Sequence, residues 1–310
     1  MENSMVSAIV ENVEKVIIGK RKAVELVMVS LLSSGHVLIE DMPGVGKTSL
    51  ISALAKSVDC TFKRIQFTPD IMPSDITGFS MYNQKNGDFE YHQGSVMSQF
   101  VLADEINRAS PKTQSSLLEV MEENQVTVDS KVYKTPTPFI VFATQNPIEY
   151  LGTYQLPEAQ LDRFFMKISL GYPDMEEELD ILNRYKTSSP LESLKTVVSS
   201  DDIIKMQGEV PNIHMDKSIS EYIVSISRAT RENKLLSLGA SPRASLCLYR
   251  AAQAYAYMNG RNYCLPDDVH ELAVPVLSHR LTLSQEARLK KSTAESIIKE
   301  ILTTIKLPVI

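Results

Sequence analysis

Short apolar runs alternate with helix-like segments in the first half of the chain. These runs are His36–Glu40, Phe62–Phe67, Gln99–Glu105, Pro138–Gln145 and Phe165–Leu170. Their residues are apolar on both faces and helical patterns separate them, which is typical of a mostly parallel sheet covered by helices on both sides. The pattern therefore predicts an α/β domain built on five strands.

The second half of the chain shows only helical periodicity after residue 185. In one segment Ile219, Tyr222, Ile223 and Ile226 recur at the spacing of a single helix face. The change of pattern falls near residues 186–193, a serine-rich stretch that contains a proline. We therefore expect an α/β domain over residues 1–188 and a helical domain over residues 189–310.

Helix ends in the second half are marked by capping residues. Ser241 followed by Pro242 predicts a helix start, and the same helix should stop at Gly260. Ser292 and Glu295 have the spacing of a capping box before the last helix.

Two β-hairpins are predicted within the first domain. Asn86-Gly87 lies between residues of strand type in residues 81–94 and is the strongest short hairpin signal. Asp129-Ser130 gives a weaker signal in residues 126–139. The sequence leaves open whether these hairpins are surface decorations or functional inserts.

Residues 37–48, VLIEDMPGVGKT, nearly match the phosphate-binding loop G-x-x-x-x-G-K-[ST]. Gly44 and Gly46 would let the backbone pass close to phosphates, Lys47 would reach the β and γ oxygens, and Thr48 would offer its hydroxyl to Mg²⁺. Asp41 replaces the first glycine, and we expect it to tolerate the unusual backbone angles of that position. The alternative is a glycine-rich turn without a ligand. The residues predicted to surround the phosphates are Pro43, Gly44, Val45, Gly46, Lys47, Thr48 and Ser49.

Asp104 and Glu105 end an apolar run where the open end of a parallel strand would meet the phosphate loop. Asp104 could hold Mg²⁺ through a water molecule, and Glu105 could polarise the attacking water. Without the loop, such a pair would more simply be a solvated strand end.

Two further residues could complete a hydrolytic site. Asn146 could orient the lytic water together with Glu105, or it could be a turn residue before Pro147. Arg163 could neutralise charge developing on the γ-phosphate, or it could form an ordinary ion pair with Asp162.

Composition narrows the possible functions. The chain has 310 residues, 43% of them hydrophobic and 23% charged, and a net charge of −6, which gives no general attraction for nucleic acid. The spacing of the three cysteines suggests neither a disulfide framework nor a zinc site. We find no signal peptide and no apolar run near the roughly 18 residues of a membrane span, so a cytoplasmic location is expected. The five histidines show no metal-ligand spacing and are interpreted as structural or surface residues: His36, His92, His214, His270 and His279.

Taken together, these residues resemble the AAA+ ATPases, and more narrowly the MoxR family. The resemblance covers nearly the whole chain. Its most specific stretches are LIEDMPGVGKT, RIQFTPDIMPSDITG, LADEINRASPKTQSSLLEVMEE, ATQNPIEYLGTYQLPEAQLDRF and GASPRA. MoxR proteins commonly carry an aspartate at the position of Asp41.

The resemblance implies a fold and a set of roles. The fold would be an αβα core with a five-stranded parallel sheet, followed by an all-α lid domain. Gly19 would lie against the adenine, Asn146 would be the first sensor and Arg243 the second, and Arg163 would be an arginine finger acting on the nucleotide of a neighbouring subunit. The hairpins resemble inserts that face the axis of a ring in related proteins.

The resemblance also implies cofactors and partners. These are ATP and Mg²⁺, a hexameric ring of identical subunits, a protein client and a partner with a von Willebrand factor A domain. The main hypothesis is Mg²⁺-dependent ATP hydrolysis that drives chaperone-like remodelling of the client. The alternatives are a nucleotide-dependent scaffold with negligible hydrolysis and a DNA-acting AAA+ motor, which the acidic balance of the chain disfavours.

Overall fold

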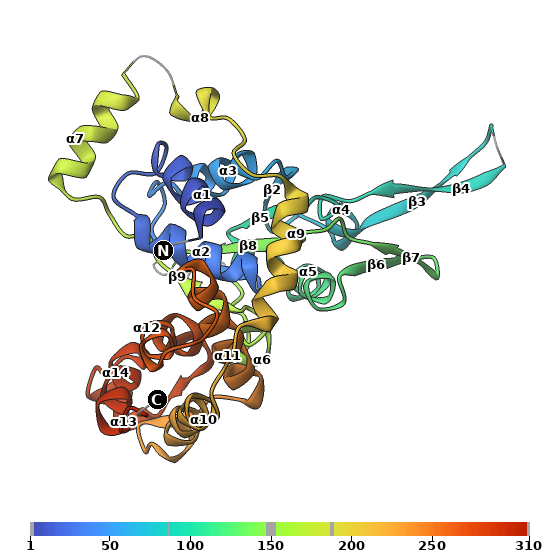
Figure 1. Ribbon diagram of the computed structural model, residues 1–310. Coiled ribbons are helices and arrows are strands. Elements are labelled where there is room, and N and C mark those ends of the chain that lie inside the picture. Colours follow the sequence, from blue (N-terminus) through green and yellow to red (C-terminus); the bar gives the residue numbers. More distant parts are fainter. Residues whose placement is uncertain (1–2, 86, 147–152, 187–188, 309–310) are drawn as a thin grey trace.

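The computed structural model describes residues 3–85, 87–146, 153–186 and 189–308. A sheet with helices on both sides forms one part of the molecule, and a bundle of helices forms another (Figure 1). Two hairpins project from the sheet part, away from the helical bundle. This arrangement agrees with the predicted α/β domain and helical lid.

The central sheet has five parallel strands in the order β2-β5-β8-β1-β9. Each strand lies within one of the five apolar runs, so this part of the prediction is confirmed. The strands are β1 (Val37–Glu40), β2 (Phe62–Gln66), β5 (Phe100–Asp104), β8 (Ile140–Gln145) and β9 (Met166–Ile168).

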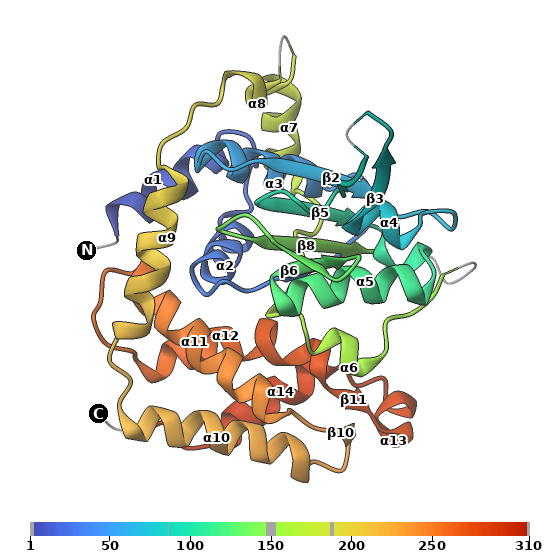
Figure 2. The ribbon, with the colours of Figure 1, turned by 90° about the vertical axis from the view of Figure 1, so that its right-hand side faces the viewer.

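Side chains alternate between two cores on the two faces of the sheet. Ile39, Leu102 and Phe142 point into one core, which is covered by α1, α2 and α3 and continues into the lid. Leu38 and Val101 point into the other core, which is covered by α5. Figure 2 shows α5 on one side of the sheet and α3 on the other. The helices are α1 (Ser4–Glu14), α2 (Arg21–Leu32), α3 (Lys47–Ser57) and α5 (Pro111–Glu123).

The lid is mainly helical, and the four apolar positions predicted on one helix face are all buried in α10. The lid also contains a two-stranded antiparallel sheet, which the helical periodicity did not reveal. These strands are only two and three residues long, too short to produce a recognisable alternation. The lid elements are α10 (Lys217–Glu232), β10 (Leu236–Leu238), α11 (Pro242–Met258), α12 (Pro266–Leu277), η3 (Ser278–Arg280), β11 (Thr282–Leu283), α13 (Gln285–Leu289) and α14 (Ala294–Thr304).

Among the described residues, three helices connect the sheet to the lid. They are α7 (Met175–Arg184), α8 (Pro190–Ser193) and α9 (Ser200–Glu209), and α9 leads into η2 (Val210–Asn212). The side chain of Gln207 on α9 donates a hydrogen bond of 2.7 Å to the carbonyl of Leu31, which anchors α9 to the end of α2. Residues 187 and 188 lie outside the described residues, so the boundary between 188 and 189 stays a prediction.

The lid also contacts the sheet domain directly. The ammonium of Lys167 on β9 lies 3.0 Å from Glu40 and 3.2 Å from Glu295 on α14. Burial acts to lower the pKa of Lys167, but the two carboxylates outweigh it and the pKa is raised. The lysine therefore stays charged and ties the lid to the strand beside β1.

The N-terminal helix makes a second contact with the lid. The backbone N–H of Asn3 donates to the carbonyl of Met258 at 3.0 Å.

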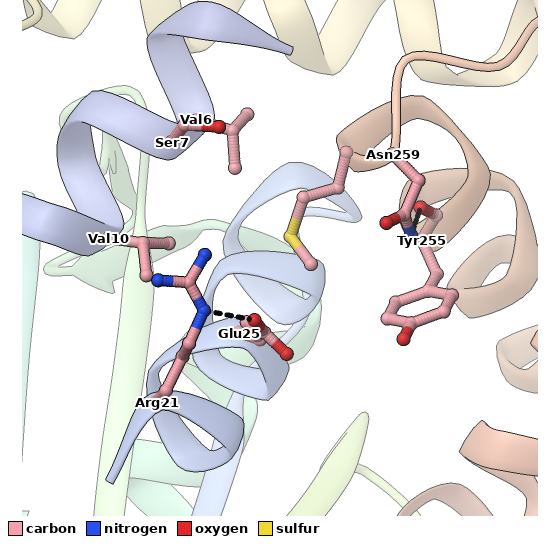
Figure 3. Close-up of a pocket in the computed structure, with 8 residues that line it drawn as sticks. Val6, Ser7, Val10, Arg21, Glu25, Tyr255 and Asn259 are labelled. Carbon is pink, nitrogen blue, oxygen red and sulfur yellow. Dashed lines mark hydrogen bonds and ion pairs between the residues drawn. The ribbon is translucent and has the colours of Figure 1, made fainter. Parts of the chain in front are cut away.

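A cavity of about 60 Å³ lies between α1, α2 and α11, where Arg21 donates a hydrogen bond to Glu25 (Figure 3). None of the predicted site residues lines this cavity.

Both predicted hairpins are present. The first pairs β3 (Gly78–Asn83) with β4 (Asp88–Gln93), and Asn86, which the sequence places between them, lies outside the described residues. The second pairs β6 (Gln125–Val128) with β7 (Lys131–Lys134). Its two turn residues, between Val128 and Lys131, have positive φ angles of 47° and 63°, as a tight two-residue turn requires.

The predicted ends of one lid helix are confirmed, whereas the predicted start of another differs from the structure. Ser241 caps α11, and Gly260 follows its end with φ of 66°. Helix α14, however, is capped by Thr293, whose hydroxyl accepts from the N–H of Ser296. The predicted cap, Ser292, is one residue too early because its N–H still bonds to the preceding helix, α13.

The remaining short helices are α4 (Pro73–Thr77), η1 (Ile106–Arg108) and α6 (Glu158–Leu161).

Candidate nucleotide site

The loop between β1 and α3 has the backbone of an anion cradle. Gly44 and Gly46 have φ angles of 85° and 92°, which L residues rarely adopt, and a Cβ at Gly44 would meet nothing within 4 Å. Helix α3 begins at Lys47, so its first free N–H groups and its positive end face the loop. Thr48 and Ser49 follow in the first turn, and the ammonium of Lys47 donates to the carbonyl of Asp41 at 2.9 Å.

The structure contradicts the backbone role that was expected of Asp41. Asp41 is not among the residues with positive φ, so it does not serve to tolerate unusual backbone angles. Its buried carboxylate instead accepts hydrogen bonds from the hydroxyl of Ser169 at 3.0 Å and from the N–H groups of Leu170 and Gly171 at 2.5 and 3.2 Å. The side chain ties the loop to the segment that follows the neighbouring strand β9.

A cavity of about 150 Å³ lies beside this loop. Its other walls come from residues 16–20 and from α7. Gly19 does not line it, although its neighbours Ile18 and Lys20 do; a Cβ at Gly19 would collide with the side chain of Glu177. Pro43 in the loop and Lys47 and Thr48 in the first turn of α3 do not line this cavity. The lining residues are Val16, Ile17, Ile18, Lys20, Gly44, Val45, Gly46, Ser49, Pro173, Ile181 and Tyr185.

The sheet order brings the two predicted carboxylates to the same edge as the loop. Strand β8 lies between β1 and β5, and all three run parallel, so their carboxyl ends are neighbours. Asp104, at the end of β5, is 9% exposed. Its Oδ1 accepts a hydrogen bond of 2.6 Å from the hydroxyl of Thr144 on β8.

Asp104 also has a charged partner that sequence reasoning missed. The guanidinium of Arg64 on β2 donates to Asp104 Oδ2 from Nε at 3.1 Å and from a terminal nitrogen at 2.5 Å. The pairing follows from the register of β2 and β5, in which Gln66 lies opposite Asp104. Arg64 is two positions earlier on the same face, and no local sequence signal identifies it as a partner.

Glu105 adopts the left-handed conformation, with φ of 56°. This region is costly for a residue with a side chain and is often found at functional sites. The N–H of Glu105 donates to the hydroxyl of Thr144 at 2.8 Å, which holds the turn. Its carboxylate accepts from Gln66 at 2.8 Å and from Arg108 at 2.9 Å. Gln66 and Arg108 were also missed by sequence reasoning.

Asn146 follows β8 at the same edge and is 8% exposed. It lies two residues after Thr144, whose hydroxyl contacts both Asp104 and the backbone of Glu105. The residues that follow it, 147–152, lie outside the described residues. The structure thus brings Asn146, the carboxylates and the loop to one edge of the sheet.

Arg163 and Arg243 are not brought to that edge. Both bind Glu122 at the end of α5: Arg163 Nε lies 3.1 Å from Oε2, and Arg243 lies 3.0 Å from Oε1. The expected alternative, an ion pair between Arg163 and Asp162, is wrong. Asp162 accepts a hydrogen bond from Ser241 and lies 3.5 Å from Arg280.

The two arginines line a second cavity of about 250 Å³ that no residue of the phosphate loop reaches. Within one chain, therefore, the guanidinium groups and the loop belong to separate surfaces. The cavity is lined by Ser33, Ser34, Gly35, His36, Met121, Glu122, Asn124, Arg163, Phe165, Arg243, Leu246, Cys247 and Arg250.

Comparison with known proteins identifies the family. The description "ATPase family associated with various cellular activities (AAA)" matches residues 36–166, and "AAA lid domain" matches residues 228–301. Chaperone MoxR1 of Mycobacterium tuberculosis is 43% identical over 305 residues, which span 96% of this chain and 80% of that protein. The chain belongs to the MoxR family of AAA+ ATPases.

Two further similarities extend over almost the full length of this MoxR-family chain. The Bacillus subtilis protein YeaC is 53% identical over 300 residues, covering 97% of this chain and 94% of that protein. A crystal structure of a provisionally described ATPase from Cytophaga hutchinsonii superposes with a TM-score of 0.92 at 39% identity, covering 99% of this chain and 96% of the other.

The oxygen donors of the MoxR-family chain fit a magnesium ion held together with a nucleotide. Mg²⁺ prefers oxygen ligands and is commonly bound by one or two carboxylates plus phosphates and water. Thr48 and Asp104 offer a hydroxyl and a carboxylate at the same sheet edge. The described residues contain no group of three or more His, Cys, Asp or Glu side chains arranged to hold a metal without a phosphate.

Two of the histidines are buried in the MoxR-family fold. The ring of His36 donates from Nε2 to the carbonyl of Met121 at 2.8 Å and accepts at Nδ1 from the N–H of Val141 at 3.0 Å. Burial lowers the pKa of His36 to about 4, and burial beside Arg280 lowers the pKa of His279.

A membrane span would need a longer and more apolar helix than any in the described part of the chain.

Proposed function

We propose that this chain is a Mg²⁺-dependent ATP hydrolase whose nucleotide lies between two neighbouring copies. One observation carries the proposal: the phosphate loop and the carboxylates share one edge of the sheet, whereas Arg163 and Arg243 lie together on another surface. A single chain therefore has each half of a hydrolytic site, but not both halves in one place. The relative named Chaperone MoxR1 supports remodelling of a protein client as the work that hydrolysis drives.

The loop and the start of α3 would bind the triphosphate. The N–H groups of residues 43–49 and the positive end of α3 favour an anion, and Lys47 would exchange the carbonyl of Asp41 for a phosphate oxygen. Adenine would lie in the cavity bounded by Ile18 and Tyr185, with Gly19 beside it. Magnesium, held through Thr48 and Asp104, would neutralise charge on the phosphates.

Glu105 and Asn146 would act on water. The carboxylate of Glu105 would accept a proton as the water oxygen attacks the γ-phosphorus and the bond to the leaving ADP oxygen breaks. Asn146 would orient that water through its amide. In the structure the Glu105 carboxylate is held by Gln66 and Arg108, so it must leave these donors before it can accept a proton.

The neighbouring copy would supply the positive charge. Arg163 and Arg243 both hold a carboxylate, Glu122, and a γ-phosphate is an anion that could replace it. Removal of an arginine finger of this kind lowers turnover by about 10³ to 10⁵. This interpretation places Arg243 on the nucleotide of the next subunit and requires a closed head-to-tail assembly, for which we propose a hexameric ring.

A subunit-mixing experiment tests the proposal. Lys47→Ala should abolish ATP binding, Glu105→Gln should bind ATP without turnover, and Arg163→Ala should bind ATP without turnover. Mixing Lys47→Ala chains with Arg163→Ala chains should restore part of the activity, because some interfaces then combine an intact loop with an intact arginine. Activity that does not rise on mixing would argue against a shared site.

A nucleotide-dependent scaffold with negligible hydrolysis is the second candidate, and the contacts on Glu105 favour it. If Gln66 and Arg108 never release the carboxylate, turnover should stay negligible at all protein concentrations. A hydrolase with a shared site should instead show specific activity that rises as the protein assembles. The client and a von Willebrand factor A domain partner could be sought by co-purification with a Glu105→Gln chain that retains ATP.

A further inference from the structure

Helix α7 lies beside the nucleotide cavity and has one face without a partner among the described residues. It follows β9, covers the cavity beside the phosphate loop and contains no buried residue. In Figure 1 it extends from the molecule on the side away from the hairpins. At 3.6 residues per turn its side chains divide into two faces with different environments.

The inner face of α7 is attached to the nucleotide cavity of its own chain. Ile181 lines that cavity, and Glu177 binds the ammonium of Lys20 at 3.1 Å. Arg184 donates to the carbonyls of Glu14 and Lys15 at 3.4 and 3.3 Å. The position of α7 is thus tied to the segment that would contact adenine.

The outer face of α7 is apolar and uncovered. Met175, Leu179 and Leu182 recur at i, i+4 and i+7 and are 80%, 51% and 66% exposed. This spacing is the pattern by which a helix docks into a groove of a partner. Glu176 and Glu178 flank the stripe and have no described ion pair, so the surface is apolar with an acidic border.

A groove with the complementary character lies elsewhere on the chain. It has a volume of about 440 Å³ between the end of α2, the α9–η2 segment and α11, and its wall includes Leu246, which is 49% exposed. Arg250 stands at its edge, and the described part of the chain provides no ion-pair partner for it. The groove is lined by Leu32, Ser33, Ser34, Gln207, Val210, Pro211, Leu246, Tyr249, Arg250 and Gln253.

We propose that the outer face of α7 docks into the α2/α9/α11 groove of a second copy of this chain. The apolar stripe would meet Leu246 and Tyr249, and the acidic border would meet Arg250. No residue of α7 lines this groove within one chain. Because helix and groove are different surfaces, the contact is head-to-tail and can continue around a ring.

The choice of a second copy rests on the proposed shared nucleotide site. The groove and the cavity that holds Arg163 and Arg243 share four lining residues, Ser33, Ser34, Leu246 and Arg250. Helix α7 in turn borders the nucleotide cavity. If the arginines of one copy face the nucleotide of the next, that copy's groove lies beside the next copy's α7. Nucleotide that presses on Ile181 and Tyr185 would then also set the position of the docking helix.

Mixing of two surface variants tests the contact. The helix variant carries Leu179→Glu and Leu182→Glu, the groove variant carries Leu246→Glu, and Leu289→Glu on α13, where the leucine is 85% exposed, is the control. Full-length proteins are compared by sedimentation velocity with ATP and Mg²⁺, each in a Glu105→Gln background that should retain the nucleotide. Binding of a fluorescent ATP analogue to dilute protein reports whether each variant keeps its own nucleotide site.

We expect each variant alone to associate at least tenfold more weakly than its parent, while the control assembles normally and all of them bind the analogue. An equal mixture of helix and groove variants should form pairs, because one intact helix and one intact groove then meet. Normal assembly of either variant, or a mixture that stays monomeric, would overturn the proposal, as would a parent that never assembles. If assembly follows these expectations but the protein with Glu105 intact does not hydrolyse ATP, the proposed function fails while this contact stands.

Discussion

The carboxylate of Asp41 accepts a hydrogen bond from the hydroxyl of Ser169 at 3.0 Å, across 128 positions of sequence. The two residues follow adjacent parallel strands, β1 and β9, at the edge of the sheet where the phosphate loop begins. The same carboxylate accepts from two backbone N–H groups of that segment. The aspartate thus fixes the loop through its side chain rather than through an unusual backbone angle.

Replacement of Asp41 by the glycine of the common phosphate-loop pattern should therefore harm the protein. Asp41→Gly leaves the buried N–H of Leu170, the partly buried N–H of Gly171 and the hydroxyl of Ser169 without their acceptor, and we expect the free energy of unfolding to fall by about 1 to 3 kcal/mol. ATP binding should weaken as the loop loses its support. Urea unfolding and ATP titration of the variant provide the measurement; equal or higher stability would show that the carboxylate is dispensable.

Much of the fold could be predicted because its signals are local. The central strands β1, β5 and β8 are apolar on both faces, and the turn residues Asp129 and Ser130 carry the positive φ angles of a tight turn. The loop, Asp104 and Glu105 could be predicted from residue type and from the rule that parallel strands place their carboxyl ends together.

The contacts that hold these residues could not be predicted in the same way. Arg64 and Gln66 reach the carboxylates only through the pairing of β2 with β5, and Glu122 meets Arg163 and Arg243 only through the packing of the lid against α5. The order of the strands and the position of the lid decide which of these residues are in contact. A single sequence without homologues reveals neither. The roles of the site residues in catalysis stay predictions.

Glu122 should restrain the two arginines before assembly. In Glu122→Gln both guanidinium groups lose their ion pair, and we expect the protein concentration that gives half-maximal ATPase activity to fall by about two- to tenfold, since partly exposed pairs contribute about 0 to 1 kcal/mol each. The measurement is specific activity across a protein dilution series. Glu119→Gln, on the same helix and exposed, is the matched control.

The opposite result for Glu122 would also be informative. If Glu122→Gln lowers activity at every protein concentration, the carboxylate positions the arginines for the neighbouring nucleotide and does not compete with it.

Arg64 should compete with magnesium for Asp104. Its guanidinium occupies one oxygen of that carboxylate, and the Arg64 side chain is 49% exposed, so the ion pair is weak. In Arg64→Gln we expect the Mg²⁺ concentration for half-maximal hydrolysis to fall by up to about fivefold. Magnesium titrations of ATPase activity should show no shift in Arg228→Gln, which removes an exposed lid pair. A rise in the magnesium requirement would mean that Arg64 helps to hold the ion's ligand in place.

His36 should make stability depend on pH. Burial lowers its pKa from 6.5 in the unfolded chain to about 4 in the fold, so the unfolded state gains a proton first as the pH falls. The contribution of neutral His36 to the free energy of unfolding is fully present above pH 6.5 and is lost as the pH falls from 6.5 to 4. The total loss is about 3 kcal/mol, of which about 2 kcal/mol is lost by pH 5.

The tautomer of His36 explains why the ring resists protonation. Nδ1 must accept from Val141, so a proton there would break that hydrogen bond and place a charge at a buried position between β8 and α5. In His36→Gln the free energy of unfolding should be lower at pH 7 but should change less between pH 7 and pH 5, by about 2 kcal/mol. Urea unfolding at both values measures this difference, and His270→Gln, at an exposed position, should keep the full dependence. An unchanged slope in His36→Gln would assign the loss of stability to other groups, among them the buried His279, whose pKa is also lowered.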